Sequence, residues 1–394
     1  MSRMRIAVIG GGFAGIEALR TLSRHRRLWG DSFEVVLFDR KEYFEFLPLL
    51  PDVLSRRMDE GCLRVGLREL SRTMPFTFIQ SEVTRVDMGS RSITYGSQET
   101  MFFEFLIIAS GSETNFFGNE ALERACFRLD TVDNAIRIRE AVLKGSRERG
   151  NLNVVVIGGG YTGIEVASNM QSLLKRSPSG FRVMIVEKAP ELLTMVPGWL
   201  RNEAADVLKK DGIDIVTGDS LKDYDGSRAC LESGRVIETC VCVWTAGVKT
   251  PRFVEGISLE KVRTRIAVDE RLGISRSREG SIFIAGDSAA FVDARTHQAL
   301  RMAVMFSIGQ GRIAAENVVR MIGKRPLIRY VPKDLGYLIP LASGRAPGII
   351  LGRRINGRIG YRLHYLMCLY RSALPNQIKM LQYWMNPGRS SREG

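Results

Sequence analysis

A glycine-rich segment that occurs twice in this chain of 394 residues constrains the fold more than any other feature. "IAVIGGGFAGIEALR" begins at Ile6, and "VVVIGGGYTGIEVAS" begins at Val154, 148 positions later. Each copy joins an apolar run to a helix-like pattern through the spacing G-x-G-x-x-G, with Gly10, Gly12 and Gly15 in the first copy and Gly158, Gly160 and Gly163 in the second. Such a turn leads a strand into a helix whose N-terminal N–H groups can hold a pyrophosphate.

Each copy is followed by a strand-like run that ends in an acid. "FEVVLFDR" contains Asp39 and "FRVMIVEK" contains Glu187, and the acid lies 29 residues after the first glycine in both copies. An acid in this place can accept hydrogen bonds from an adenosine ribose. The alternative, two tight turns without a ligand, leaves the matched spacing unexplained. We therefore expect two dinucleotide sites in an α/β fold with two Rossmann-like domains and parallel sheets.

Composition narrows the choice of partners. The formal net charge is +14 and the pI is near 9.7, which favours a polyanionic partner. No recognised nucleic-acid module is present, so we expect an anionic membrane surface and no nucleic acid. No apolar run approaches the ~20 residues of a spanning helix, and the N-terminal residues show no signal-peptide pattern. No metal site is predicted.

Three further segments extend the pattern: "FEFLIIASGS" (103–112), "GSIFIAGDSAAF" (280–291) and "CVCVWTAGV" (240–248). With them, the sequence resembles the two-dinucleotide-binding flavoprotein superfamily, in which the first fold holds FAD and the second holds NAD(P)H. The resemblance implies that Asp287 bonds the ribityl chain of FAD, and that Ala246 and Gly247 lie near the nicotinamide. It also implies a discontinuous layout: an FAD domain at 1–112 and 249–325, an inserted NAD(H) domain at 113–248, and a C-terminal segment at 326–394.

More specifically, the sequence resembles type II NADH:quinone oxidoreductases. "FEFLPLLPDVLS" (44–55), "SGSETNFFG" (110–118) and "LGYLIPLASGRAPGIILG" (335–352) carry this resemblance. It places Glu165 where the family has a glutamate that faces flavin and quinone; the alternative is a helix N-terminal acid satisfied by the dipole. The remaining cofactor contacts that it implies are Ala14, Arg40, Pro48, Val83, Ala109, Ser110 and Gly111 for FAD, and Thr162 for NADH.

One segment departs from the family pattern A-Q-x-x-x-Q-Q-G, which lines the quinone pocket. The aligned stretch is "VMFSIGQG" (304–311), in which Met305 and Gly309 replace two glutamines. A glutamine can donate a hydrogen bond to a quinone carbonyl and methionine cannot. Met305, Ser307 and Gln310 are the expected pocket residues, with Ser307 as a substitute donor.

The C-terminal segment has an amphipathic pattern. Ile359, Leu363, Leu366, Met367 and Tyr370 recur at helical spacing, Pro375 interrupts the pattern, and Ile378, Leu381, Trp384 and Met385 form a second stripe. The flanking basic residues are Arg353, Arg354, Arg358, Arg362, Arg371 and Lys379. This pattern is typical of two short helices in a membrane interface. A core-packed helix or a homodimer interface is the alternative.

The cysteines argue against disulfide chemistry. Disulfide reductases and sulfide:quinone reductases carry paired cysteines beside the flavin, whereas Cys62 stands alone here. Cys240 and Cys242 would point to opposite faces of a strand. Cys126 and Cys368 are a conceivable pair, but buried inert thiols are favoured.

These observations predict an FAD-dependent NADH dehydrogenase that passes hydride to FAD and then two electrons to a membrane quinone, without proton pumping. Glu187 would repel the 2′-phosphate of NADPH, so NADH is the expected donor. The enzyme is expected on the cytoplasmic face of the cell membrane as a peripheral protein. Two alternatives stay open: a soluble NAD(P)H diaphorase resembling ferredoxin reductases, and a non-catalytic flavoprotein that senses NADH.

Overall fold

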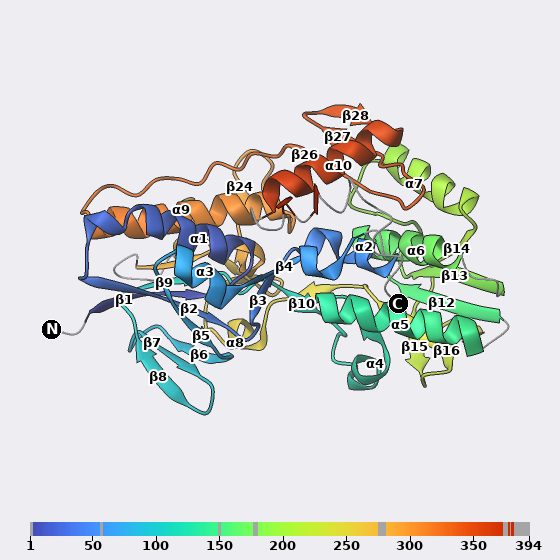
Figure 1. The fold of residues 1–394 in the computed structure, drawn as a ribbon, viewed down its shortest axis with the longest axis horizontal. Helices are drawn as coiled ribbons and strands as arrows, with labels where there is room; N and C mark the ends of the chain where they lie inside the picture. The colour runs from blue at the N-terminus through green and yellow to red at the C-terminus, as the bar shows by residue number, and fades with distance from the viewer. Residues whose placement is uncertain are drawn as a thin grey trace. The chain divides into compact units, whose positions relative to one another are not determined.

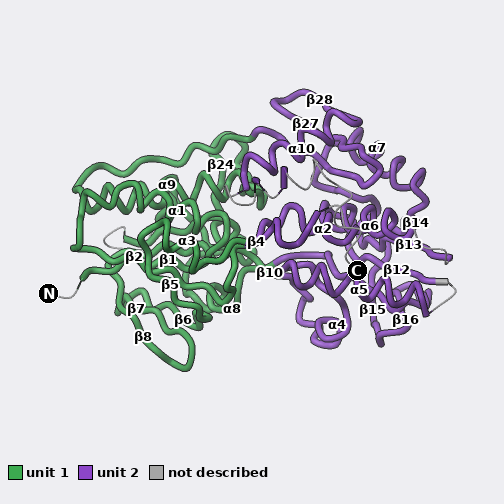
Figure 2. The backbone as a smooth tube through the Cα atoms, in the orientation of Figure 1, with its two compact units in different colours: residues 1–44, 65–113, 249–334 green, residues 45–64, 114–248, 335–394 purple. Residues whose placement is uncertain are grey.

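The structure, a computed structural model, describes residues 3–55, 58–148, 151–175, 180–274, 281–372, 377–378 and 380–381. The chain divides into two compact units, coloured separately in Figure 2. Unit 1 comprises Met1–Phe44, Val65–Glu113 and Lys249–Asp334, and unit 2 comprises Glu45–Arg64, Thr114–Val248 and Leu335–Gly394. Each unit is described below by itself.

Unit 1 is built on a five-stranded sheet in the order β22-β9-β1-β2-β5, and all of its neighbouring strands run parallel. The strands are β1 (Met4–Ile9), β2 (Phe33–Asp39), β5 (Thr77–Gln80), β9 (Phe105–Ile108) and β22 (Ile282–Ile284). Apart from β5, their central residues are buried, as expected of near-continuous apolar runs in a parallel sheet. Helices α1 (Phe13–Arg24) and α9 (Val304–Ile322) lie side by side in Figure 1 and in the contacts.

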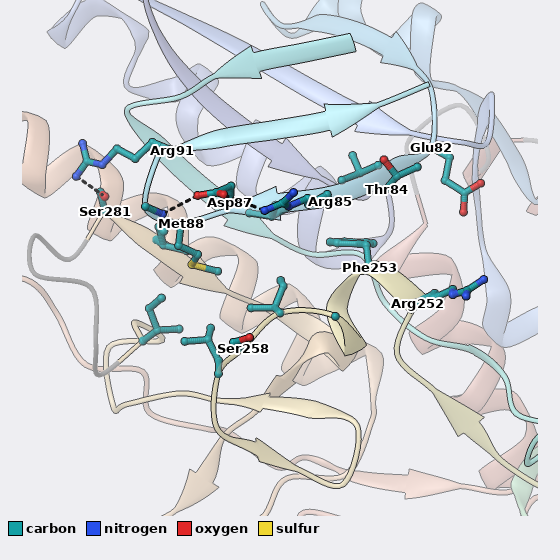
Figure 3. Close-up of a pocket in the computed structure, with 18 residues that line it drawn as sticks. Glu82, Thr84, Arg85, Asp87, Met88, Arg91, Arg252, Phe253, Ser258 and Ser281 are labelled. Carbon is teal, nitrogen blue, oxygen red and sulfur yellow. Dashed lines mark hydrogen bonds and ion pairs between the residues drawn. The ribbon is translucent and has the colours of Figure 1, made fainter. Parts of the chain in front are cut away.

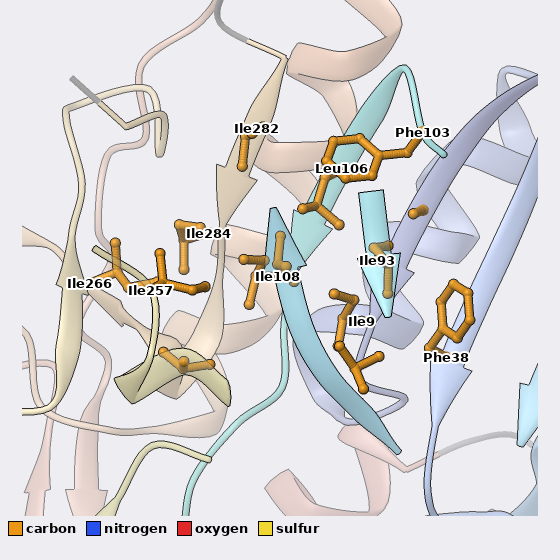
Figure 4. Close-up of a cluster of buried hydrophobic side chains, with 14 of the residues drawn as sticks. Ile9, Phe38, Ile93, Phe103, Leu106, Ile108, Ile257, Ile266, Ile282 and Ile284 are labelled. Carbon is orange, nitrogen blue, oxygen red and sulfur yellow. The ribbon is translucent and has the colours of Figure 1, made fainter. Parts of the chain in front are cut away.

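The core of unit 1 includes side chains from the sheet and from shorter strands around it. Figure 4 shows Ile9, Ile108 and Ile284 from the parallel sheet together with Ile93 and Ile266 from shorter strands. The other elements of unit 1 are α3 (Leu67–Thr73), β6 (Val83–Asp87), β7 (Ser92–Tyr95), β8 (Glu99–Phe102), α8 (Arg252–Glu255), β20 (Lys261–Val262), β21 (Arg265–Ala267), β23 (Ala289–Ala290), β24 (Val292–Asp293) and β25 (Gln298–Ala299).

Unit 2 repeats the arrangement with a five-stranded parallel sheet in the order β11-β18-β12-β13-β14. Its strands are β11 (Phe127–Arg128), β12 (Asn151–Ile157), β13 (Gly180–Glu187), β14 (Ile213–Thr217) and β18 (Val241–Trp244). The helices are α2 (Leu50–Leu54), α4 (Glu120–Ala125), α5 (Val132–Glu148), α6 (Tyr161–Leu174) and α7 (Gly198–Lys210). A three-stranded antiparallel sheet follows β14, formed by β15 (Leu221–Tyr224), β16 (Arg228–Leu231) and β17 (Val236–Glu238).

The end of the chain belongs to unit 2. Strands β26 (Gly336–Leu338), β27 (Gly348–Ile350) and β28 (Arg353–Ile355) form an antiparallel sheet, and helix α10 (Gly357–Arg371) follows directly. The helix packs closely, because a Cβ on Gly360 would lie 2.0 Å from the carbonyl oxygen of Ala346. Short strands β3 (Tyr43–Glu45), β4 (Arg64–Gly66), β10 (Glu113–Thr114) and β19 (Val248–Lys249) lie at or near the points in the sequence where the units change.

The predicted fold class is confirmed: two Rossmann-like parallel sheets, with a helix near the C-terminus. The expected domain layout differs from the units. Residues 45–64 group with unit 2, residues 326–334 group with unit 1, and the segment from Leu335 onward groups with unit 2. The domain functions assigned above stay predictions.

Candidate functional site

The first glycine-rich turn joins β1 to α1 in unit 1. Gly10 has φ of +103°, and a Cβ there would lie 2.3 Å from the carbonyl oxygen of Ala109, so only glycine fits. A Cβ on Gly15 would lie 1.8 Å from the carbonyl oxygen of Gly10. Because glycine has no Cβ, the helix can pack directly onto the turn. Gly12 is different, because nothing lies within 4 Å of its Cβ position. No side chain caps the N-terminus of α1, so its N–H groups are available to an anion beside Gly12.

Asp39 ends β2 and holds this turn. Its Oδ2 accepts a hydrogen bond from the N–H of Gly11 at 2.6 Å, and its Oδ1 accepts one from the N–H of Lys41 at 2.8 Å. A cavity of about 70 Å³ beside the turn is lined by several predicted residues, namely Gly10, Asp39, Arg40, Val83 and Ser110. The structure thus places these five predicted residues around one cavity. Pro48, another predicted FAD contact, belongs to unit 2, in the turn Leu47–Leu49.

Asp287 follows β22 in a short turn (Gly286–Ser288) within the same unit. Ser112 donates a hydrogen bond to its Oδ2 at 2.9 Å, and Ser110 lies 2.9 Å from Ser288 through the two hydroxyl oxygens. Burial raises the pKa of Asp287, while hydrogen bonds from Ser112 and Ser307 and the charge of Arg265 oppose the shift. The result is a mostly buried acceptor group next to the segment that contains Gly111. Sequence reasoning did not identify Ser112 as part of this group.

The second glycine-rich turn joins β12 to α6 in unit 2 with the same geometry. Gly158 has φ of +106°, and a Cβ on Gly163 would lie 1.8 Å from the carbonyl oxygen of Gly158. Nothing lies within 4 Å of the Cβ position of Gly160, and no side chain caps α6. Glu187 ends β13, and its carboxylate accepts hydrogen bonds from the N–H groups of Gly159 at 2.5 Å and Ala189 at 2.7 Å.

The other predicted residues of the second site lie around this turn. A Cβ on Gly158 would come within 2.8 Å of the Cα of Ala246, and one on Gly247 within 2.9 Å of the ring of Phe117. Thr162 is exposed in the first turn of α6. The segment at Ala246 therefore forms one side of the glycine-rich turn, as Ala109 does in unit 1.

Glu165 lies on α6, one turn beyond the glycines. Burial raises its pKa well above the ordinary value, and the charge of Asp52 raises it further. A helix N-terminus acts in the opposite direction, because its dipole lowers the pKa of a nearby acid; the redox role of Glu165 stays a prediction. Glu165, Asp52 and Tyr365 line one crevice with Asn169 and other residues. Sequence reasoning missed Asp52 and Tyr365, although "LLPDVLS" places an acid inside an apolar stretch.

The segment that departs from the quinone-pocket pattern forms the start of α9 in unit 1. Gln310 is 1 % exposed, and its Oε1 accepts a hydrogen bond from the N–H of Gly286 at 2.8 Å. Ser307 contributes a hydrogen bond to Asp287, and Met305 is half-buried. A Cβ on Gly309 would lie 3.1 Å from the ring of Tyr330, so the tyrosine ring fills the space that a longer side chain would need.

Helix α10 has two different faces. The predicted apolar stripe is the outer one: Ile359, Leu366 and Tyr370 are 68 %, 58 % and 84 % exposed. The opposite face packs into unit 2 and carries Tyr361, His364, Tyr365 and Cys368, of which Cys368 is buried. In the second predicted stripe, Ile378 and Leu381 are also exposed, whereas Pro375, Trp384 and Met385 lie outside the described residues.

All six cysteines are free. The conceivable pair Cys126–Cys368 is wrong, because Cys126 lies beside Cys242, 3.8 Å apart through the two sulfur atoms. Cys368 instead lies 3.6 Å from Nε2 of His364 on its own helix. Sequence spacing could not reveal the Cys126–Cys242 neighbours, which are 116 residues apart: Cys126 directly precedes β11, and Cys242 lies in the adjacent strand β18.

A larger hollow of about 1330 Å³ lies elsewhere in unit 1 (Figure 3). Arg85, Asp87 and Arg91 border it, and Arg252 and Phe253 come from α8. Of the predicted site residues only Val83 touches it.

Within the described residues, no helix is long and apolar enough to cross a membrane. The same residues contain no group of three or more side chains suited to hold a metal ion.

Known proteins with similar sequences and structures agree with this architecture. The chain is 24 % identical over 381 residues to the type II NADH:quinone oxidoreductase of Staphylococcus aureus, covering 90 % of this chain and 92 % of the relative. The structure matches NDH2 of Plasmodium falciparum in complex with NADH with a TM-score of 0.86, at 14 % identity and 98 % coverage of both chains. It matches the sulfide:quinone oxidoreductase of Aquifex aeolicus with a TM-score of 0.77, at 18 % identity, over 93 % of this chain and 90 % of the other. The resemblance read from the motifs is thereby confirmed. The family model described as pyridine nucleotide-disulphide oxidoreductase matches residues 4–326, and the chain belongs to that family.

Proposed function

We propose that the chain binds FAD at the turn in unit 1 and NADH at the turn in unit 2. The fit of a dinucleotide rests on the same observations in both places. The Cβ positions of Gly12 and Gly160 face open space, which a bound pyrophosphate could occupy and a side chain would block. The helix that follows each glycine has no side-chain cap. An N-terminal helix turn with free N–H groups favours a pyrophosphate.

The assignment of FAD to unit 1 is supported by Asp287 and its serine neighbours. The buried carboxyl group can accept hydrogen bonds from the hydroxyl groups of a ribityl chain, which NADH lacks. When bound, FAD supplies two-electron redox chemistry that side chains do not provide.

The activity that these sites support best is oxidation of NADH with transfer of two electrons to a membrane quinone, without proton pumping. The observation that carries this proposal is the pair of matched dinucleotide turns in one chain, together with the half-buried acid Glu165. Quinone reduction consumes protons as well as electrons, and an acid with a raised pKa keeps a proton that it can supply at higher pH than an ordinary carboxyl group. The residues of the chain bind and orient the nucleotides and exclude water, while Glu165 exchanges a proton.

Steady-state NADH oxidation with a short-chain quinone tests this proposal. We expect turnover in the usual range of about 1–10³ s⁻¹. Reduction of the flavin by NADH without turnover on any acceptor would instead indicate an NADH sensor.

The second candidate, a soluble diaphorase with another acceptor, is favoured by the packing at Gly309. Because Tyr330 occupies the space beside Gly309, the chain cannot place a glutamine there without moving the ring. An assay with ferricyanide as a second electron acceptor distinguishes the quinone reductase from the diaphorase. Turnover with ferricyanide but none with a quinone, whether free or dissolved in liposomes, would favour the diaphorase.

We also propose that the outer face of α10 docks on an anionic bilayer at the cytoplasmic face of the cell membrane. Three large apolar side chains, Ile359, Leu366 and Tyr370, are exposed on this face, and the nearby Arg358 and Arg362 are exposed too. Apolar insertion combined with basic neighbours is the character of an interfacial helix. Each basic residue near an anionic surface adds ~1 kcal/mol, and this part weakens with salt.

Sedimentation with phosphatidylglycerol vesicles measures the docking. The triple variant Ile359→Ser, Leu366→Ser, Tyr370→Ser should bind at least about tenfold more weakly, because each side chain would contribute roughly 1.5–3 kcal/mol when buried. Phe102→Ser is the matched control, since Phe102 is 60 % exposed on β8 in unit 1. High salt should release only part of the wild-type protein.

Three outcomes would contradict docking on a bilayer: no binding of the intact chain at any salt, unchanged binding of the triple variant, or a dimer in the absence of vesicles that the triple variant abolishes. The last would identify the face as a homodimer interface. These point variants are sharper than truncation after Asn356, because truncation would also remove the inner face of α10 with its buried Cys368.

A further inference from the structure

Two carboxyl groups from distant parts of the sequence line one narrow crevice in unit 2. Asp52 comes from α2 and is 4 % exposed, and Glu165 comes from α6. The crevice between them is too narrow for a water molecule, although Glu165 is only half-buried and also reaches solvent. Two like charges in such a place repel each other strongly, because little water screens them. The pair is therefore stable when it carries one negative charge and one proton.

Helix α10 supplies a hydrogen-bond donor to one of the two carboxyl groups. Tyr365, on its inner face, donates a hydrogen bond to Oδ1 of Asp52. Burial raises the pKa of Tyr365 well above its usual value, and the charge of Asp52 raises it further, so the phenol keeps its proton and acts as the donor. A hydrogen bond from a phenol to a carboxylate is charge-assisted and favours the ionised form of Asp52.

Glu165 has no comparable donor. Among the described residues, no side chain bonds or pairs with its carboxyl group. The neighbouring Asn169 is engaged elsewhere: its Nδ2 donates to the carbonyl oxygen of Glu165 at 3.0 Å, and its Oδ1 accepts from the hydroxyl of Ser55 at 2.5 Å. Burial and the charge of Asp52 both favour the neutral form of Glu165.

The other titratable groups around the crevice do not offset this difference. Burial lowers the pKa of His364 to about 4, with the charge of Arg371 acting in the same direction, so the imidazole is neutral at pH 7. Burial raises the pKa of Cys368, so its thiol stays protonated. Arg139 donates to the carbonyl oxygen of Val53 at 3.1 Å and pairs with Glu60. The remaining phenol on this face, Tyr361, stacks near Tyr365 with ring centroids 4.8 Å apart.

We propose that Asp52 and Tyr365 are positioning residues for Glu165: the phenol of Tyr365 keeps the negative charge of the pair on Asp52, and Glu165 holds the shared proton at neutral pH. The arrangement divides two carboxyl groups into a fixed anion and a proton donor through their different environments.

The use of this proton rests on the proposed function. A quinone becomes a quinol by taking up two electrons, which NADH supplies, and two protons. Glu165 gives one proton to a carbonyl oxygen of the quinone, an O–H bond forms as the carboxyl O–H bond breaks, and the second proton is the one that the hydride of NADH brings with its two electrons. Glu165 is then a carboxylate beside the Asp52 carboxylate. Repulsion between the two charges favours recapture of a proton from water and resets the pair.

Infrared titration of the carboxyl C=O stretch in the flavin-loaded protein tests the proposal without any acceptor. The wild type should show a protonated-carboxyl band at pH 7 that Glu165→Gln removes. Asp52→Asn should lower the midpoint of this band by at least about one pH unit, because it removes a like charge while the amide oxygen still accepts from Tyr365. These midpoints belong to the coupled pair.

Tyr365→Phe tests the phenol directly. In the background of Glu165→Gln, the remaining carboxyl titration is that of Asp52, and adding Tyr365→Phe should move its midpoint to higher pH because Asp52 loses the hydrogen bond from the phenol. Tyr224→Phe is the matched control: Tyr224 is 4 % exposed in the same unit but does not line the crevice, and its loss should leave the band unchanged.

Turnover adds a second readout. The alkaline limb of kcat with a quinone should move to lower pH in Asp52→Asn by the same shift as the infrared midpoint. Persistence of the band in Glu165→Gln, or an unchanged midpoint in Asp52→Asn, would overturn the proposal. A protein that shows the expected infrared shifts but reduces no quinone would refute the proposed function and leave the proton assignment standing.

Discussion

Glu17 and Glu165 occupy the same place in the two copies of the glycine-rich motif, 148 residues apart, yet their surroundings differ. Glu17 lies on α1 and pairs with Arg20 at 2.8 Å, one turn along the same helix. Glu165 lies on α6 beside another carboxyl group, and its pKa is raised by burial. The turns themselves match closely, since Asp39 and Glu187 accept from the central glycine N–H at 2.6 Å and 2.5 Å. A repeated motif thus fixes backbone geometry, while neighbours from elsewhere in the chain decide the chemistry of each side chain.

The largest expected effect concerns the open glycines. Gly12→Val places a side chain where the protein has nothing within 4 Å, so the fold should survive while FAD binding is lost. Gly160→Val should keep FAD and abolish NADH binding. Flavin absorbance of the purified proteins and NADH titration measure both. Loss of NADH binding with FAD retained in Gly12→Val would reverse the assignment of the two sites.

Gly15→Val provides the contrast for this prediction. Its Cβ would lie 1.8 Å from the carbonyl oxygen of Gly10, so this variant should fail to fold with or without a ligand.

The next effect separates the two glutamates. Glu165→Gln should lower kcat with a quinone by about 10²-fold, within the usual contribution of a positioned acid, and should leave the rate of flavin reduction by NADH nearly unchanged. Glu17→Gln removes the local ion pair with the exposed Arg20 and should keep kcat within twofold. Stopped-flow flavin reduction and steady-state turnover provide the two rates. Equal losses in both variants would mean that the contrast between the two glutamates has no catalytic meaning.

A smaller effect is expected for the acids at the strand ends. Glu187→Ser removes the charge that would face a 2′-phosphate and should raise the kcat/KM ratio of NADPH to NADH by about tenfold. Because Glu187 also accepts from two backbone N–H groups, the activity with NADH should fall somewhat as well. Asp39→Ser at the equivalent place in unit 1 should weaken FAD retention without changing the nucleotide preference. A wild type that already prefers NADPH would contradict this role of Glu187.

The smallest effect is on stability. The pKa of Glu165 is raised in the folded chain, so at pH values above its unfolded pKa the folded chain holds more protons than the unfolded chain. The free energy of unfolding should therefore fall as pH rises through this range, by at most about 1.4 kcal/mol per pH unit for one group. Glu165→Gln should remove that part of the decline and Glu17→Gln should not. Urea denaturation between pH 5 and pH 9 measures how the free energy of unfolding changes with pH in the wild type, Glu165→Gln and Glu17→Gln. The same pH dependence in all three proteins would contradict a raised pKa of Glu165.

Much of the architecture could be predicted because it depends on local chemistry. Gly10 and Gly158 adopt positive φ, Gly15 and Gly163 allow a helix to touch a turn, and an acid closes the turn from 29 residues away. Each requirement falls on a specific residue type at a specific spacing, so the sequence alone determines two parallel sheets and two dinucleotide turns. The apolar stripe of α10 was visible for the same reason, because helical spacing sets which residues share a face.

Tertiary structure decided what each side chain meets. Asp52 and Tyr365 are 313 residues apart and share a hydrogen bond only because α2 and α10 pack in one unit. Cys126 faces Cys242 instead of Cys368 because β11 and β18 are neighbours. The ring of Tyr330 fills the space beside Gly309. Burial and long-range contact set the protonation of a carboxyl group and the room beside a helix, and neither is encoded in the spacing of a motif, so only the folded chain shows that its two glutamates differ.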